Sequence, residues 1–217
     1  MKIKWLGHSC FLLTSDSGTR VLTDPFDSRV GYKLPSVEAD IVTISHGHGD
    51  HNYVQAVRGK FVQISQAGTF EHHGIRMTGI PVFHDEVNGS KRGKNIIYLF
   101  DIDGIGICHC GDLGHIPSQA QLDEIGKVDF LLLPVGGTYT VDYAEAWKIV
   151  QLIKPRVTIP MHFQAGIVNF PLDRVDKFLA EAGAGGRKDI FAGKQELEVT
   201  PDKLAALPEI LVLDYES

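Results

Sequence analysis

An apolar run of the chain passes directly into a cluster of histidines, Ile41-Val42-Thr43-Ile44-Ser45-His46-Gly47-His48-Gly49-Asp50-His51. Residues 39–45 are rich in β-branched side chains, which predicts a buried strand. Gly47 and Gly49 allow the backbone to turn sharply after that strand, and they place no side-chain bulk beside the donors. Residues 46–51 therefore present three histidines and one aspartate that can bind metal ions.

The donor types in this cluster indicate which ions it would bind. Imidazole and carboxylate ligands together suit zinc, iron or manganese. A single catalytic zinc takes only about three protein ligands and a water, so a fourth clustered donor points to two ions. The alternative is a polar loop whose histidines cap a helix or face solvent. The density of donors in the cluster argues against that interpretation.

Three further donors follow apolar runs elsewhere in the chain. His84 comes after Ile80-Pro81-Val82-Phe83, Asp112 after residues 105–110 with Gly111 between, and His162 after Ile159-Pro160-Met161. Each run predicts a strand, and functional side chains gather where strands end. His84 taken alone would be read as an ordinary loop residue. The recurrence of the pattern favours a shared site.

Hydrophobic periodicity predicts a strand-rich first half and alternating strands and helices after it. We expect strands at residues 3–6, 10–14, 20–24, 39–45, 61–65, 76–80, 96–102, 105–110, 129–135, 156–160, 196–199 and 210–213. We expect helices at residues 118–125, 142–153 and 172–182, and a surface loop at His72-His73. Two mixed sheets covered by helices would bury these elements, which predicts an α/β fold in one domain over residues 1–217.

Composition narrows the class of protein. The hydrophobic share of 43% and the charged share of 22% are typical of a globular protein. A net charge of -6 argues against a long basic nucleic-acid groove, but bound metal could still attract a small anion. Cys10, Cys108 and Cys110 lie in apolar runs and read as buried thiols. With no signal-like start and no membrane-length apolar run, we expect a protein of the reducing cytoplasm without membrane contact.

The donors resemble the ligand series of the metallo-β-lactamase superfamily, which is His-x-His-x-Asp-His, then His, then Asp or Cys, then His. The matching residues are His46, His48, Asp50, His51, His84, Asp112 and His162. Leu22-Thr23-Asp24-Pro25 is similar to an early strand of the family that ends in a structural aspartate. The opening Leu6-Gly7-His8-Ser9-Cys10-Phe11 resembles the branch that contains L-ascorbate-6-phosphate lactonase.

The resemblance implies a four-layer αββα sandwich with the site at one edge. It implies one metal ion held by His46, His48 and His84, a second held by Asp50, His51 and His162, and Asp112 bridging the two. It also implies that Asp24 orients the ligand histidines. The common zinc β-lactamases have cysteine at the Asp112 position, so antibiotic hydrolysis is disfavoured here.

These residues predict a metal-dependent hydrolase that uses a hydroxide bridging two metal ions to attack a small ester, lactone or phosphodiester. Asp50 is the expected catalytic residue, since it could orient the attacking water and carry a proton. We expect zinc or manganese, with iron or nickel as alternatives. A nuclease acting on short or single-stranded nucleic acid is the second hypothesis. A di-iron redox or metal-binding scaffold without hydrolysis is the third.

Candidate substrate contacts are His8, Lys91, Arg92, His115 and Tyr139. His8 fits a substrate contact and a structural hydrogen bond equally well. The basic residues after His84 could receive a phosphate, although a solvated loop is the simpler interpretation. The expected partner is therefore a small molecule, with a phosphorylated one as an option, and assembly into a homo-oligomer stays open.

Overall fold

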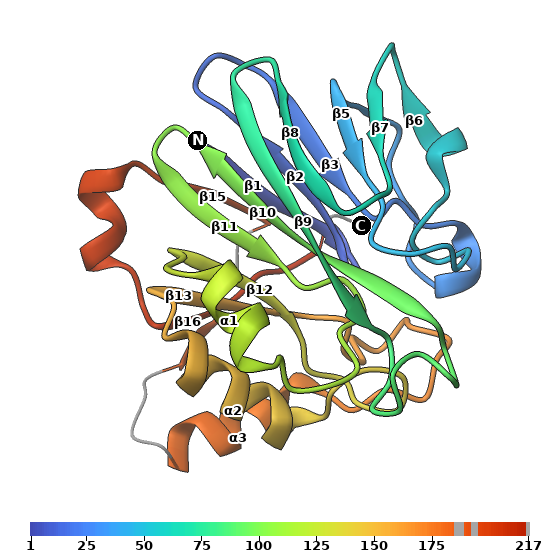
Figure 1. Ribbon diagram of the computed structural model, residues 1–217, viewed down its shortest axis with the longest axis vertical. Helices are drawn as coiled ribbons and strands as arrows, with labels where there is room; N and C mark the ends of the chain where they lie inside the picture. Colours follow the sequence, from blue (N-terminus) through green and yellow to red (C-terminus); the bar gives the residue numbers. More distant parts are fainter. Residues whose placement is uncertain (185–188, 192–194, 216–217) are drawn as a thin grey trace.

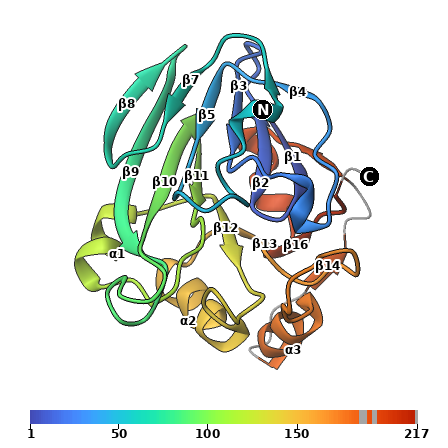
Figure 2. The ribbon, with the colours of Figure 1, turned by 90° about the vertical axis from the view of Figure 1, so that its right-hand side faces the viewer.

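Two β-sheets face each other in the described part of the chain, and α-helices lie along the outer side of one of them (Figure 1). The computed structural model describes residues 1–184, 189–191 and 195–215. The strand order is β15-β1-β2-β3-β5-β7 in one sheet and β14-β16-β13-β12-β11-β10-β9-β8 in the other. Figure 2 shows the helices below the larger sheet, with the smaller sheet on its opposite side.

The six-stranded sheet combines hairpins with parallel strands. Its members are β1 (Lys2–Gly7), β2 (Cys10–Thr14), β3 (Arg20–Thr23), β5 (Ile41–Thr43), β7 (Val62–Ile64) and β15 (Glu196–Glu198). Strands β15, β1, β2 and β3 pair antiparallel, whereas β3, β5 and β7 pair parallel. Strand β1 exposes Lys2 and buries Ile3 and Trp5, the alternation of a strand with one solvated face. In β5 all three residues are buried, as a strand covered on both faces requires.

The eight-stranded sheet begins as a meander and continues as parallel strands. Its members are β8 (Gly68–His72), β9 (Ile75–Phe83), β10 (Lys94–Ile102), β11 (Ile105–His109), β12 (Phe130–Pro134), β13 (Val157–Met161), β14 (Asp189–Phe191) and β16 (Ile210–Val212). Strands β8 to β11 pair antiparallel, and β11, β12, β13, β16 and β14 pair parallel. Parallel neighbours need long crossover connections, and the helices supply them.

The α-helices among the described residues are α1 (Gln119–Ile125), α2 (Tyr143–Ile153) and α3 (Val175–Ala184). Ser118 and Asp142 cap α1 and α2, and each forms a reciprocal capping box with the residue three positions later. Both starts agree with the sequence prediction. The third helix begins later than expected, because the Leu172 amide bonds Phe170 O and the Asp173 amide bonds Gly136 O, which keeps that segment non-helical. It also continues through Gly183.

Two elements of the meander differ from the prediction. Strand β8 was not expected, since its residues are mostly exposed and show little apolar alternation. His72, expected in a loop, is the last residue of this strand, and His73 and Gly74 make the turn into β9. Strand β9 also extends beyond its predicted end to Phe83, so it reaches the residue before His84.

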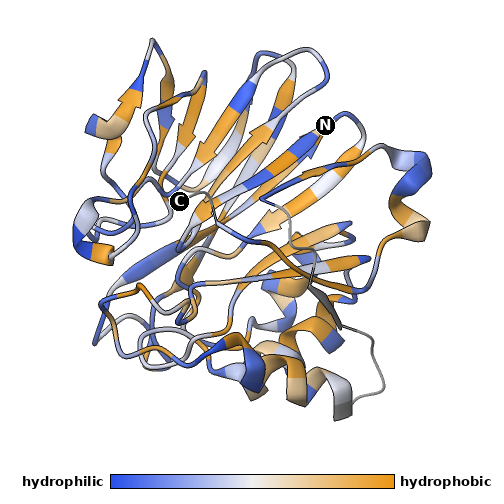
Figure 3. Ribbon diagram, turned by 180° about the vertical axis from the view of Figure 1, so that it is seen from behind, coloured by the Kyte–Doolittle hydropathy of each residue, from blue (hydrophilic) through white to orange (hydrophobic). Residues whose placement is uncertain are grey.

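The main core lies between the two sheets and continues under the helices. Trp5, Phe11 and Leu13 of the smaller sheet share one cluster with Ile107 and Leu131 of the larger sheet. A second cluster covers the outer face of the smaller sheet. It lies beneath η1 (Ser28–Val30), η2 (Val54–Ala56) and a two-stranded ribbon of β4 (Val37–Glu38) and β6 (Val57–Arg58). Hydrophobic residues recur along the strands of both sheets in Figure 3.

The predicted α/β sandwich is confirmed, with one difference in its layers. The outer cover of the smaller sheet consists of short 3-10 turns and the β4–β6 ribbon, whereas the larger sheet carries the α-helices. A last 3-10 helix, η3 (Pro201–Ala206), precedes β16. None of the helices in the described ranges combines the length and the apolar character that crossing a membrane would need.

The chain direction places the predicted ligands at one edge of the sandwich. Parallel strands end at the same edge of a sheet, and β3, β5, β11 and β13 all have partners of this kind. Asp24 follows β3, His162 follows β13 and Asp112 lies three residues after β11. The candidate metal-binding side chains that follow strands of both sheets therefore lie in a common region.

Candidate metal centre

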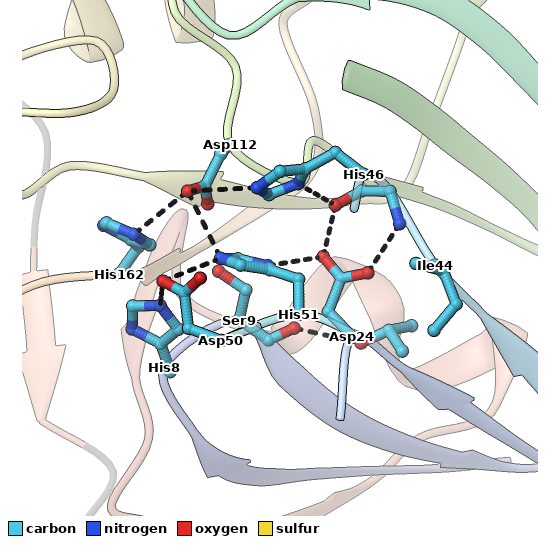
Figure 4. A network of polar contacts seen from close by, with 12 residues as sticks. His8, Ser9, Asp24, Ile44, His46, Asp50, His51, Asp112 and His162 are labelled. Atoms are coloured by element: carbon cyan, nitrogen blue, oxygen red, sulfur yellow. Dashed lines mark hydrogen bonds and ion pairs between the residues drawn. The ribbon is translucent and has the colours of Figure 1, made fainter. Parts of the chain in front are cut away.

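Histidines converge on one carboxylate oxygen of Asp112 at this edge, and Figure 4 shows His46, His51 and His162 around it. The Nε2 atoms of His51 and His84 each lie 3.2 Å from Asp112 Oδ2, that of His162 lies 3.3 Å away and that of His46 lies 3.9 Å away. The histidines come from the loops after β5, β9 and β13. Segments far apart in the sequence thus meet around a single buried aspartate.

The donors divide into groups on either side of Asp112. One group is His46, His48 and His84, whose ligand atoms all lie within 4.8 Å of one another. A second group is His8, Asp50, His51 and His162, by the same measure. Asp112 itself groups with His46 and His51, one residue from each side. Two of these groups contain the residues that the resemblance assigns to the two metal ions, with His8 added to the second group.

The spacing of these atoms fits metal ions rather than direct contacts between side chains. His46 Nε2, His51 Nε2 and Asp112 Oδ1 are buried and have no hydrogen-bond partner among the described residues. Donors that bind one zinc ion at about 2.0–2.1 Å lie roughly 3.3 Å apart. The nearest spacings around Asp112 Oδ2, 3.2 to 3.3 Å, have this size. The set of imidazoles and carboxylates is therefore suited to holding divalent metal.

Asp24 orients two of the histidines from behind. His51 Nδ1 donates a hydrogen bond to Asp24 Oδ2 at 2.9 Å. Ser45 Oγ donates to the same oxygen at 2.6 Å and accepts from His46 Nδ1 at 2.9 Å. With both Nδ1 atoms occupied, the Nε2 atoms of His46 and His51 point toward Asp112, as in metal sites with an outer carboxylate. Asp24 was expected here, whereas Ser45 was missed although it directly precedes His46.

Asn95 fixes the backbone that carries Asp112. Its side-chain amide donates to Cys110 O at 2.8 Å, and its Oδ1 accepts from the Asp112 amide at 3.0 Å. Gly111 between them has a left-handed φ of 53°, and a Cβ there would lie 2.5 Å from both Asn95 Oδ1 and Ser45 Cβ. Only glycine fits this close approach. Asn95 gave no signal in the sequence, since a single buried asparagine in β10 belongs to no motif.

His8 lies behind the second ligand group. Its Nε2 donates to Asp50 Oδ2 at 3.3 Å, and its ring packs against that of His162 with centroids 4.2 Å apart. The His162 amide donates to His8 O at 3.2 Å, which ties the β1–β2 turn to the end of β13. His8 is fully buried, so it contacts ligand residues rather than the open pocket.

Burial and neighbouring charges shift the pKa values of these groups. Burial, helped by His162, lowers the pKa of His8 to about 4, and burial with His51 lowers that of His46 to about 3. Both are therefore neutral imidazoles at neutral pH, the form that binds metal. Burial would raise the pKa of Asp112, but His162 and His51 outweigh it and keep that carboxyl ionised.

A pocket of about 300 Å³ opens onto the ligands. Its walls are His48, Asp50, His84, Arg92, Asp112, Tyr139, His162 and Phe170. Arg92 and Tyr139 were predicted substrate contacts, and both lie on this wall. Phe170 was missed, because nothing in its local sequence distinguishes it from a core aromatic residue. It lies edge-on to Tyr139 with ring centroids 6.0 Å apart.

Two other predicted substrate contacts lie outside the pocket wall. Lys91 is exposed and forms an ion pair with Glu86. His115 accepts a hydrogen bond from the Phe83 amide at 3.2 Å and donates to Ile116 O at 2.9 Å. Both ring nitrogens of His115 are thus used by the backbone, which explains its position without a substrate.

Comparison with known proteins agrees with this geometry. The β-lactamase superfamily domain matches residues 2–162 of the chain. The UPF0173 metal-dependent hydrolase of Thermoplasma acidophilum is 33% identical over 214 residues, which span 86% of this chain and 92% of the relative. A hydrolase of the same description from Archaeoglobus fulgidus is 30% identical over 81% of this chain and 87% of its own length.

A solved structure shows the same relationship in three dimensions. A Thermotoga maritima protein, assigned by its crystal structure's description to the Zn-dependent hydrolases of the metallo-β-lactamase superfamily, is 37% identical. It covers 99% of both chains with a TM-score of 0.81. The donor series, the sandwich and these relatives agree. The chain belongs to the metallo-β-lactamase superfamily and is a metal-dependent hydrolase of that superfamily.

Proposed function

We propose that this hydrolase cleaves a small ester, lactone or phosphodiester with the help of two divalent metal ions. The observation that supports this most directly is the position of Asp112 Oδ2, which faces His46 and His84 on one side and His51 and His162 on the other. Two ions held there would lower the pKa of a bound water toward neutrality and polarise a substrate oxygen. Zinc and manganese suit these ligands best, with iron and nickel as alternatives.

Asp50 is the proposed catalytic residue. Its carboxylate lines the pocket and accepts a hydrogen bond from His8. Burial would raise the pKa of Asp50, but His8 and then His51 lower it below its ordinary value. The carboxylate is therefore ionised at neutral pH, and it can orient the attacking water and take up its proton.

The pocket suits a small substrate. A volume of about 300 Å³ is at the lower end of the usual range of ligand sites, roughly 300–1,000 Å³. Tyr139 and Phe170, whose rings are in edge contact, add aromatic surface to the pocket wall. An apolar wall excludes water beside the reacting bond and strengthens the electrostatic interactions there.

We also propose that the chain forms a single domain and that it acts in the cytoplasm. The two sheets share one hydrophobic cluster, which supports a single domain. Cys10, Cys108 and Cys110 are buried free thiols, a state that suits a reducing cytoplasm.

The test pairs metal analysis with two substrate panels. Purified protein should contain two divalent ions per chain, and reconstituted protein should hydrolyse members of a lactone panel or a phosphodiester panel. His48→Ala and Asp50→Ala should each lower kcat by about 10³-fold or more while the circular dichroism spectrum stays unchanged. His48 is exposed, so its loss leaves no core cavity. His72→Ala, at the end of β8, serves as the control and should retain full activity.

Undiminished activity in either ligand variant, or after metal is stripped, would contradict the proposal. Less than one ion per chain, measured under conditions that prevent metal loss, would contradict the two-ion mechanism.

A further inference from the structure

Arg92 is a cation on a pocket wall whose other residues are histidines, the carboxylates of Asp50 and Asp112, and the aromatic residues Tyr139 and Phe170. It is half-buried and lies near the end of the loop that connects β9 to β10. Its guanidinium donates a hydrogen bond to Thr138 O at 3.0 Å and lies over the Tyr139 ring at 5.6 Å from the centroid. These neutral partners hold the side chain in place without neutralising it.

Several other arginines are paired with carboxylates, whereas Arg156, like Arg92, bonds backbone carbonyl oxygens. Arg20 bonds Asp40 and Glu38, and Arg29 bonds Asp27. The guanidinium of Arg92 contacts no carboxylate within the described part of the chain, and Thr138 accepts one of its five N–H donors. Arg92 therefore keeps an uncompensated charge and free donors beside the pocket.

The surroundings of Arg92 are arranged before any substrate binds. Its backbone amide donates to Asp85 Oδ2 at 2.7 Å, which fixes the base of the side chain. Thr138 has a left-handed φ of 59°, an unfavourable backbone conformation, and its hydroxyl donates to Pro171 O at 2.7 Å. Strain of this kind persists where the surroundings determine the conformation, and it is common at ligand-binding sites. A guanidinium held in place loses less freedom when a ligand binds.

A second pocket lies on the other face of residues that line the first, since both are lined by His48 and Arg92. It has a volume of about 720 Å³, shares His48 and Arg92 with the first pocket, and adds Lys94 and Gln66 to its wall. A substrate that reaches from the metal ligands past Arg92 would bring its next functional group against the guanidinium, with a second cation beyond.

We propose that Arg92 recognises an anionic group, a phosphate or a carboxylate, carried by the small-molecule substrate next to the bond that is cleaved. Arginine matches both groups with two parallel hydrogen bonds, which a lysine cannot reproduce. The proposal rests on the proposed hydrolysis and names its substrate class. The net charge of -6 argues against a long nucleic acid as the source of the anion.

The first test measures binding without turnover. Metal-loaded protein is titrated with tetrahydrofurfuryl phosphate, tetrahydrofuran-2-carboxylate and neutral tetrahydrofurfuryl alcohol in a calorimeter. We expect an anionic probe to bind more tightly than the alcohol. Arg92→Gln should lower the affinity for that anionic probe by about tenfold or more. Arg92→Lys should give an intermediate loss. Arg58→Gln, the same change at an exposed arginine of β6, is the matched control and should leave the affinity unchanged.

The second test uses γ-hydroxymethyl-γ-butyrolactone and its phosphate ester as substrates. The ratio of kcat/KM for the phosphorylated lactone to that for the neutral one should exceed unity and fall about tenfold in Arg92→Gln. A comparison of the affinities for the phosphate and carboxylate probes shows which of these two anionic groups Arg92 recognises.

Equal affinity of Arg92→Gln and Arg58→Gln for every anionic probe would overturn the assignment, because the anion would then bind elsewhere. Tighter binding of a short single-stranded oligonucleotide, lost in Arg92→Gln, would overturn the small-molecule class. If both hydrolysis panels fail while the anionic probe binds through Arg92, the proposed reaction is wrong and the anion site stands.

Discussion

His8 has a side chain that is entirely buried, yet its Nδ1 has no partner among the described residues. The other ring nitrogen lies 3.3 Å from Asp50 Oδ2, a distance that suits either a hydrogen bond or two ligands of one ion. The residue adopts a left-handed φ of 52°, and its carbonyl accepts from the Trp5 indole and the His162 amide. A buried ring nitrogen without a partner and a left-handed backbone are both unfavourable, and such features persist at functional sites. We therefore infer that His8 supports the second ligand group.

Replacing His8 should therefore weaken the second metal ion more than the first. His8→Asn keeps a residue type that tolerates left-handed backbone but removes the imidazole beside Asp50. We expect the affinity for the second ion to fall by about 10- to 100-fold, as for other groups that orient metal ligands. Calorimetric titration of metal-free protein with Zn²⁺ or Mn²⁺ measures this. Two unchanged binding steps would show that His8 has no part in the site.

The loop between β9 and β10 is organised by one carboxylate. Asp85 accepts hydrogen bonds from the amides of Val87, Gly89, Lys91 and Arg92, at 2.7 to 3.0 Å. The His84 amide donates to Gly93 O, which closes the base of the loop. Burial would raise the pKa of Asp85, but these amides lower it to about 2. The loop thus positions the metal ligand His84 at its start and Arg92 near its end.

Asp85→Ala should impair both functions of the loop at once. We expect kcat/KM to fall by about 10²-fold, because small displacements of a positioned group cost rate of this order. Glu86→Ala, which removes an exposed acid from the same loop, is the control and should change activity little. Wild-type activity in Asp85→Ala would show that the loop is held by other contacts.

The Asp85 carboxylate also makes the stability of the folded chain depend on pH in acid. Because its pKa is lower in the folded chain than in the unfolded chain, Asp85 stabilises the fold fully above about pH 4. This contribution is lost as the pH falls through about 2. Thermal melts of metal-free wild type and Asp85→Ala should therefore differ at pH 7 and converge toward pH 2. A difference that persists at pH 2 would contradict the assignment.

At the scale of the whole molecule, the metal centre joins the two sheets. Asp24, His46 and His51 follow strands of the smaller sheet, whereas His84, Asp112 and His162 follow strands of the larger sheet. The ligand atoms are buried and lack other partners at several positions. Bound ions would therefore stabilise the contact between the two sheets, in addition to taking part in the reaction.

Removing the metal should lower the melting temperature. One ion at a free concentration of about 1,000 times its Kd stabilises the folded state by about 4 kcal/mol. For a chain of this size that corresponds to a shift on the order of 10 °C. Scanning calorimetry of chelator-treated and reloaded protein measures the shift, and Asp112→Asn should reduce it. Coincident melting curves for stripped and reloaded protein would show that the ions do not bridge the sheets.

The sequence by itself predicted much of the architecture and most of the donors that gather at the candidate metal site. Side-chain alternation and capping residues act over a few positions, so β2 and the starts of α1 and α2 were predicted correctly. The dense run from His46 to His51 is local for the same reason. His84, Asp112 and His162 could be proposed because each follows an apolar strand.

Only the tertiary structure decided which other residues meet these ligands. Ser45, Asn95 and Phe170 belong to no motif, and the pairing of Arg92 with Thr138 joins two loops that are 46 residues apart. The physical reason is that such contacts depend on how the strands align across the sheets, which local periodicity does not encode. The sequence thus indicated which donors could bind metal, and the folded chain showed which other residues line the pocket beside them.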